Sequence, residues 1–120
     1  MKRATIYHNP RCSKSRQTLA LLEARPELEL EVVRYLETPP SAETLDQLCL
    51  ALELEPQGLL RRKEARLKEL GLKGDEARTR AEWLETLAEN PILIERPIVL
   101  AGRRAKIGRP PESVLALFEG

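Results

Sequence analysis

The first third of the chain alternates between a strand pattern and a helix pattern. Thr5-Ile6-Tyr7 is a β-rich run that stops at Asn9-Pro10, because proline discourages further strand pairing. Leu19 and Leu22 then share one face at helical spacing, which predicts a helix between Cys12 and Arg25-Pro26. A second strand is predicted over 28–36, where apolar residues alternate with glutamates before a run of β-formers.

The middle of the chain, from Ser41 to about Asn90, carries helical patterns. Ser41 is a good N-cap, and the helix that it begins has three leucines on one face: Leu45, Leu48 and Leu52. Further helical pieces are predicted near 56–70 and 79–89, with Gly71 and Gly74 between them.

The last third returns to a strand pattern. Residues 97–107 predict a β-hairpin that turns around Ala101-Gly102-Arg103. Pro110-Pro111 then opens a final helix, whose apolar residues are Val114, Leu115, Leu117 and Phe118.

The order of these elements predicts the fold class. A strand, a helix and a second strand at this spacing form a parallel βαβ unit, because the crossover is right-handed. A βαβ half followed by a ββα half is the thioredoxin-like, or glutaredoxin-like, arrangement of a mixed four-stranded α/β sheet. We therefore predict one thioredoxin-like domain over residues 1–120, with a helical insertion at about 41–90.

Composition and charge exclude several classes of partner. Twenty Lys and Arg against nineteen Asp and Glu leave a net charge of +1, so no global field recruits nucleic acid or an anionic membrane. The sequence shows no apolar run long enough to span a bilayer and no secretory signal pattern after Met1-Lys2-Arg3. We expect a cytoplasmic protein, in which the two cysteines remain separate thiols.

Cys12 is the first candidate for chemistry because it stands at the predicted start of the first helix. Unpaired backbone N–H groups and the positive end of the helix dipole favour a thiolate there. Arg11, Lys14 and Arg16 flank it, and Ser15 can donate a hydrogen bond to sulfur or to an oxyanion. The alternative is a small buried hydrophobe, against which the polar neighbours argue.

Three common kinds of cysteine site do not match the spacing of residues in this sequence. Ser15 stands where a CxxC redox motif has its second cysteine, so a resolving thiol must come from elsewhere. The phosphatase spacing Cys-x5-Arg would need arginine where Thr18 stands, and one histidine with two distant cysteines matches no zinc spacing. Cys49 lies in an apolar helical stretch and is interpreted as structural, or as an adventitious thiol.

His8 and Arg96 are the next candidates. His8 either stabilises the thiolate or shuttles a proton, or else it merely hydrogen-bonds the loop after its strand. In a thioredoxin-like layout the proline that opens the third strand is usually cis, and the residue before it faces the cysteine. Arg96, which precedes Pro97, would then meet Cys12.

Several other arginines stand near predicted element ends. Arg61, Arg62 and Arg109 suit a tetrahedral oxyanion, since the guanidinium stays charged and donates two parallel hydrogen bonds, but most such arginines are solvated surface groups. Trp83 and Leu87 are four residues apart and are predicted to lie in the core.

These residues resemble one family over essentially the whole chain. The segments 7–16 (YHNPRCSKSR), 35–39 (YLETP), 59–61 (LLR), 95–99 (ERPIV) and 107–112 (IGRPPE) closely resemble the glutaredoxin-linked arsenate reductases, in matching order and spacing. The resemblance implies a thioredoxin-like fold with an inserted helical part.

The resemblance also implies a mechanism. The cysteine that matches Cys12 attacks arsenate as a thiolate and forms a covalent adduct, glutathione reduces the adduct, and glutaredoxin resolves the mixed disulfide. The family's three oxyanion arginines fall on Arg61, Arg96 and Arg109, and its histidine near the nucleophile falls on His8. No tightly bound cofactor is implied, since glutathione acts as a co-substrate. Arg62 follows Arg61 directly, and spacing to Leu70-Gly71-Leu72 favours Arg61 for the site.

Two other functions compete with this one. A glutathione-linked thiol oxidoreductase with another substrate would use the arginines for glutathione carboxylates. A transcriptional regulator of the Spx type, which binds RNA polymerase, usually senses oxidation through CxxC, and Ser15 argues against it.

Overall fold

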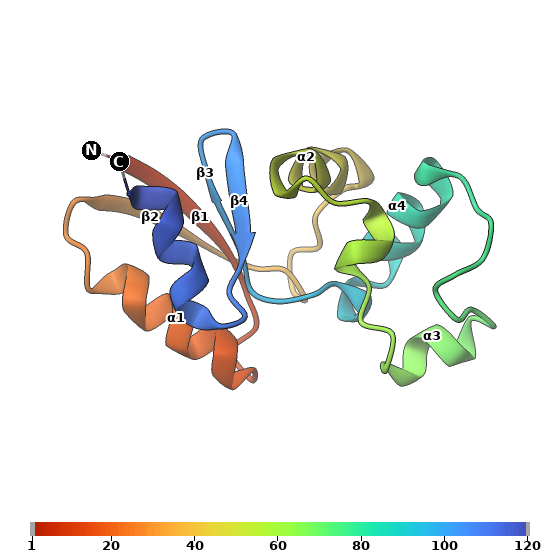
Figure 1. The fold of residues 1–120 in the computed structure, drawn as a ribbon. Coiled ribbons are helices and arrows are strands. Elements are labelled where there is room, and N and C mark those ends of the chain that lie inside the picture. The colour runs from red at the N-terminus through yellow and green to blue at the C-terminus, as the bar shows by residue number, and fades with distance from the viewer. Residues whose placement is uncertain (1, 120) are drawn as a thin grey trace. The chain divides into compact units, whose positions relative to one another are not determined.

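The computed structural model describes residues 2–119, which form two compact units, one built from residues 2–38 and 96–119 and the other from residues 39–95 (Figure 1). We call them the sheet unit and the helical unit. The helical unit corresponds to the predicted insertion at about 41–90. The prediction that the whole chain is one domain stays a prediction.

The sheet unit contains one four-stranded sheet in the order β2-β1-β3-β4. Its strands are β1 (Lys2–His8), β2 (Leu28–Arg34), β3 (Ile98–Ala101) and β4 (Arg104–Ile107). β1 pairs with β2 in parallel, with Ile6 opposite Val32, and with β3 in antiparallel, with Ile6 opposite Val99. β3 and β4 form the predicted hairpin, which turns at Gly102 with a φ of 62°. This is the predicted thioredoxin-like arrangement.

Two helices cover one face of this sheet: α1 (Ser13–Glu23) and the C-terminal 3₁₀ helix η3 (Pro111–Phe118). Figure 1 shows η3, in blue, lying beside α1, in orange. Their buried side chains share a core with alternate residues of the central strands, because successive strand residues point to opposite faces. This core comprises Ala4, Ile6, Leu22, Val99, Val114 and Phe118.

The helical unit contains α2 (Ala42–Leu52), η1 (Pro56–Leu59), α3 (Ala65–Glu69), α4 (Arg80–Glu89) and η2 (Pro91–Leu93). Ser41 caps α2 as predicted, its hydroxyl accepting from the Thr44 backbone N–H at 3.1 Å. Leu45 and Leu48 are fully buried and Leu52 partly so, which confirms the apolar face of that helix. Trp83 and Leu87 of α4 are also buried, as predicted.

Three predicted elements differ from the structure. The helical piece predicted near 56–70 is divided into η1 and α3, because Leu60 pairs with Ile94 in an isolated β-bridge between them. The second strand ends at Arg34, because the carbonyl of Arg34 accepts the N–H groups of Glu37 and Thr38 and so closes a turn. The last helix is wound as a 3₁₀ helix, a distinction that hydrophobic spacing does not make. Among the described residues, no helix combines the length and apolar character needed to cross a membrane.

Candidate active site

Cys12 is the N-cap residue of α1, and its backbone is extended. A tight turn delivers it from the end of β1, with the Cys12 N–H donating to the Asn9 carbonyl at 3.0 Å and the Arg11 N–H donating to Asn9 Oδ1 at 3.0 Å. The Arg16 N–H then donates to the Cys12 carbonyl as the first helical bond. The thiol is partly exposed and stands before the unpaired N–H groups of the helix, as the sequence predicts.

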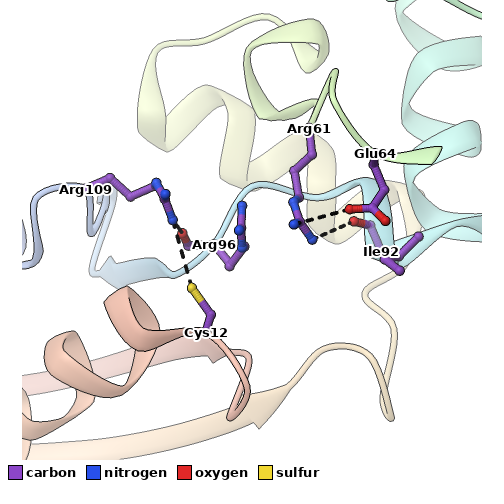
Figure 2. A network of polar contacts seen from close by, with 6 residues as sticks. All are labelled: Cys12, Arg61, Glu64, Ile92, Arg96 and Arg109. Atoms are coloured by element: carbon purple, nitrogen blue, oxygen red, sulfur yellow. Dashed lines mark hydrogen bonds and ion pairs between the residues drawn. The ribbon is translucent and has the colours of Figure 1, made fainter. Parts of the chain in front are cut away.

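Two arginines of the sheet unit lower the pKa of the Cys12 thiol (Figure 2). Arg109 Nη1 lies 3.9 Å from Cys12 Sγ, and the positive charge of Arg96 acts on the thiol through space. Burial would raise the pKa of the Cys12 thiol, but the Ser15 N–H, the Arg96 charge, the Lys14 N–H and the Arg109 side chain outweigh it, and the pKa is lowered overall. The geometry therefore favours a thiolate nucleophile.

Short backbone links hold the two arginines beside α1. The Arg96–Pro97 peptide bond is cis, as expected for the proline that opens β3, and Arg109–Pro110 is cis as well. The Gly108 N–H donates to the Pro97 carbonyl at 2.9 Å, which joins the two arginine-bearing segments. Arg109 Nη1 also donates to the Arg96 carbonyl at 3.4 Å. The Arg109 guanidinium thus contacts both the Cys12 sulfur and the backbone of Arg96.

His8 and Ser15 form a buried pair behind the cysteine. His8 Nδ1 lies 2.6 Å from Ser15 Oγ, which also accepts the Asn9 N–H at 3.0 Å. Burial, with Arg34 and Arg16, lowers the pKa of His8, so folding favours its neutral imidazole. The expectation that the Ser15 hydroxyl binds the oxyanion needs correction, because that side chain is 0% exposed and bonded to His8 and Asn9. Its backbone N–H faces the sulfur instead.

Arg61 and Arg62 belong to the helical unit. The Arg61 guanidinium donates to the Ile92 carbonyl at 3.2 Å and pairs with Glu64 at 3.2 Å, as Figure 2 shows. Arg61 is half-buried, whereas Arg62 is exposed and lies against Gly74. That Arg61 contributes to the oxyanion site stays a prediction.

Similarity to known proteins identifies the family of this chain. A family model described as the ArsC family matches residues 7–117. The chain belongs to the ArsC family. It is 45% identical over 119 residues to a protein of Neisseria meningitidis named arsenate reductase, covering 98% of this chain and all of that one. It is 49% identical over 117 residues to the Escherichia coli protein YfgD, covering 97% of each chain.

The solved structures agree with the ArsC assignment. A structure described as arsenate reductase from Vibrio cholerae superposes with a TM-score of 0.89 at 48% identity, covering 97% of this chain and 98% of that one. The predicted family and the thioredoxin-like α/β fold class are thereby confirmed.

The second thiol of this ArsC-family chain has the opposite environment. Cys49 lies in α2 and is 0% exposed. Burial raises its pKa to about 11, so it stays protonated at neutral pH. Within the described residues, no three His, Cys, Asp or Glu side chains are grouped as a metal site.

Sequence reasoning missed two residues that support the site, Thr18 and Gly108. Thr18 is fully buried, and its Oγ1 donates to the Lys14 carbonyl at 2.8 Å. The available signal was its position four residues before the buried Leu22, which puts a hydroxyl on the apolar face of α1. Gly108 lies in the segment 107–112 that carries the family resemblance, but nothing in the sequence indicates its role, since only the packing of α1 against the strand ends makes a methyl group there crowd Thr18 and Pro97.

Proposed function

We propose that the chain is an arsenate reductase whose nucleophile is Cys12. The supporting observation is a partly exposed thiol of lowered pKa at the start of α1, with the Arg109 guanidinium 3.9 Å from its sulfur. The membership of the ArsC family and the 45% identity to a protein named arsenate reductase support the choice of oxyanion.

In the first step the Cys12 thiolate attacks the arsenic of arsenate. A sulfur–arsenic bond forms, an arsenic–oxygen bond breaks, and the departing hydroxide takes a proton from solvent and leaves as water. Arsenic stays pentavalent in this step. Arg109 and Arg96 stabilise the thiolate before attack, and the same fixed cations neutralise the oxyanion in the adduct. We assign Arg61 as the third oxyanion arginine, on the resemblance to the family.

In the second step a thiol from outside the chain reduces the adduct. Glutathione thiolate attacks the Cys12 sulfur, a disulfide forms, and the electron pair of the sulfur–arsenic bond stays on arsenic, which leaves as arsenite. A glutaredoxin thiolate then attacks the glutathione sulfur of the mixed disulfide and releases the Cys12 thiolate. Glutathione and glutaredoxin together supply the two electrons.

The cysteines of the chain support the need for an outside thiol. The chain has only two cysteines, and Cys49 is buried with a pKa of about 11, which makes it a poor resolving thiol. Position 15, where a dithiol protein has its second cysteine, holds a buried serine that anchors His8. The proposed glutathione and glutaredoxin are reductants of the cytoplasm, where we propose that the protein acts.

We assign His8 an indirect role in this reaction. The neutral imidazole holds the Ser15 hydroxyl, and Ser15 in turn presents its backbone N–H to the sulfur. His8 therefore supports the thiolate by fixing the first turn of α1.

A coupled assay tests the function. Purified protein is mixed with glutathione, glutathione reductase and glutaredoxin, and NADPH oxidation is followed with and without arsenate. We expect arsenate-dependent oxidation that Cys12→Ser abolishes and Cys49→Ala retains. Oxidation that does not depend on arsenate, with Cys12 still reactive, would instead identify a glutathione-linked thiol oxidoreductase of another substrate.

A further inference from the structure

Gly108 lies between β4 and Arg109 at a point that has no room for a side chain. A methyl group at Gly108 would lie 2.5 Å from Thr18 Oγ1, 2.8 Å from Pro97 Cγ and 3.1 Å from Thr18 Cγ2. The backbone of Gly108 is not in the left-handed region, so alanine would meet no conformational penalty there. The requirement for glycine comes from this close approach alone.

The residue that Gly108 rests on is itself fixed. Thr18 is 0% exposed, and its hydroxyl donates to the Lys14 carbonyl in the first turn of α1. On the other side, the Gly108 N–H donates to the Pro97 carbonyl at 2.9 Å. Gly108 is therefore held between the helix that carries Cys12 and the segment that follows Arg96.

The contact between Arg109 and the sulfur is sensitive to the position of Gly108. Arg109 is the next residue along the chain, and the 3.9 Å from its Nη1 to Cys12 Sγ is near the upper limit of a hydrogen bond to sulfur. A shift of Gly108 away from α1 would move the backbone from which Arg109 extends and would lengthen this contact. Packed interiors transmit such displacements because they have little free volume.

We propose that Thr18 and Gly108 form a seat that sets the distance between the Arg109 guanidinium and the Cys12 sulfur, which makes both of them positioning residues for chemistry at this thiol. Their part in arsenate reduction rests on the proposed function. Their effect on the reactivity of Cys12 does not, and it is measured without arsenate.

The test is a double-mutant cycle read out by the alkylation rate of Cys12 with iodoacetamide, in a Cys49→Ala background. Gly108→Ala should slow alkylation by up to about fivefold, the loss expected when one cation at this distance leaves the sulfur. In an Arg109→Ala background the same substitution should change nothing further, because the seat acts through Arg109. Additive effects of the two substitutions would overturn the proposal.

Two further variants check the steric cause. Thr18→Ala removes the two Thr18 atoms that the new methyl group meets and leaves Pro97 Cγ, so adding it to Gly108→Ala should restore part of the alkylation rate. A double variant as slow as Gly108→Ala would contradict the seat. Gly58→Ala is the matched control, because the three atoms nearest to a methyl group there all belong to the Leu54 side chain of the helical unit, and its rate should equal that of the parent.

If Gly108→Ala does not fold, the same double-mutant cycle can be measured with Thr18 variants instead. Thr18→Val keeps the packing against Gly108 and should keep the alkylation rate, whereas Thr18→Ala should slow it only when Arg109 is present. Equal rates for Thr18→Val and Thr18→Ala would overturn the proposal. Failure of the proposed function can be told apart from failure of the seat. No arsenate-dependent NADPH oxidation together with a non-additive cycle would reject arsenate as the substrate and still support the seat.

Discussion

Removal of the Arg109 guanidinium should make Cys12 less reactive by an amount that the structure bounds. The charge lies 3.9 Å from the sulfur. At that distance a unit charge pair is worth about 1 kcal/mol in the dielectric of water and about 4 kcal/mol at an effective dielectric constant of about 20. Because Arg109 is exposed, the lower figure applies, and about 1 kcal/mol corresponds to roughly a fivefold loss of thiolate.

The assay is the second-order rate of alkylation by iodoacetamide, measured at a pH below the pKa of the thiol, where the rate follows the thiolate fraction. Arg109→Ala should react roughly fivefold more slowly than the parent, both carrying Cys49→Ala, and added salt should narrow the gap. Arg103→Ala is the matched control, since it removes another exposed arginine, from the hairpin turn between β3 and β4.

The comparison of the two arginine variants decides whether this reasoning is correct. If Arg109→Ala and Arg103→Ala react at the same rate, the 3.9 Å contact does not stabilise the thiolate. If both are slowed equally, the effect comes from the total charge of the protein and not from the site. Only a selective loss in Arg109→Ala supports the proposed pairing.

Three further predictions follow from buried or titrating groups. Ser15→Ala should lower the free energy of unfolding in urea by about 1–3 kcal/mol, because it leaves the buried His8 ring and the partly buried Asn9 N–H without their partner, while exposed Ser13→Ala should not. Cys49, with a pKa of about 11, should stay unlabelled in native protein at neutral pH, and mass spectrometry showing label there as fast as at Cys12 would contradict its burial. Folding lowers the pKa of Cys12, so the folded state binds the thiol proton less tightly than the unfolded state does. The free energy of unfolding should therefore rise with pH up to about 8.5, and this contribution should be lost as the pH falls through the folded pKa. Thermal unfolding of Cys12→Ser, followed over the same pH range, should lack this contribution.

Local signals explain the parts of the molecule that the sequence predicts well. Asn9-Pro10 ends β1, Ser41 begins α2, and Gly102 turns the hairpin, and each of these depends on residues close together in the chain. The position of Cys12 at the start of α1 follows from the same local order. Arg96 could be placed because the fold class brings the residue before Pro97 to that helix end.

The features that sequence reasoning missed depend on contacts between distant segments. Whether the Ser15 hydroxyl faces solvent or the protein interior is decided by His8 at the end of β1, and no spacing within the helix reveals it. The contact of Gly108 with Thr18 joins positions 90 residues apart by number, and it exists only once the segment after β4 lies against α1. Side-chain direction and close approach are properties of packing, which periodicity does not encode.

The long contact between Arg109 and the sulfur suits the chemistry that we propose. The thiolate carries negative charge only until it attacks, and after attack that charge lies on the oxygens bound to arsenic. A guanidinium held 3.9 Å from sulfur and also bonded to the Arg96 carbonyl at 3.4 Å is committed strongly to neither partner. It can therefore stabilise the nucleophile and then turn its remaining N–H groups to the oxyanion with little loss. A shorter ion pair would stabilise the thiolate more, but it would also raise the barrier to attack, because only interactions that strengthen in the transition state speed the reaction.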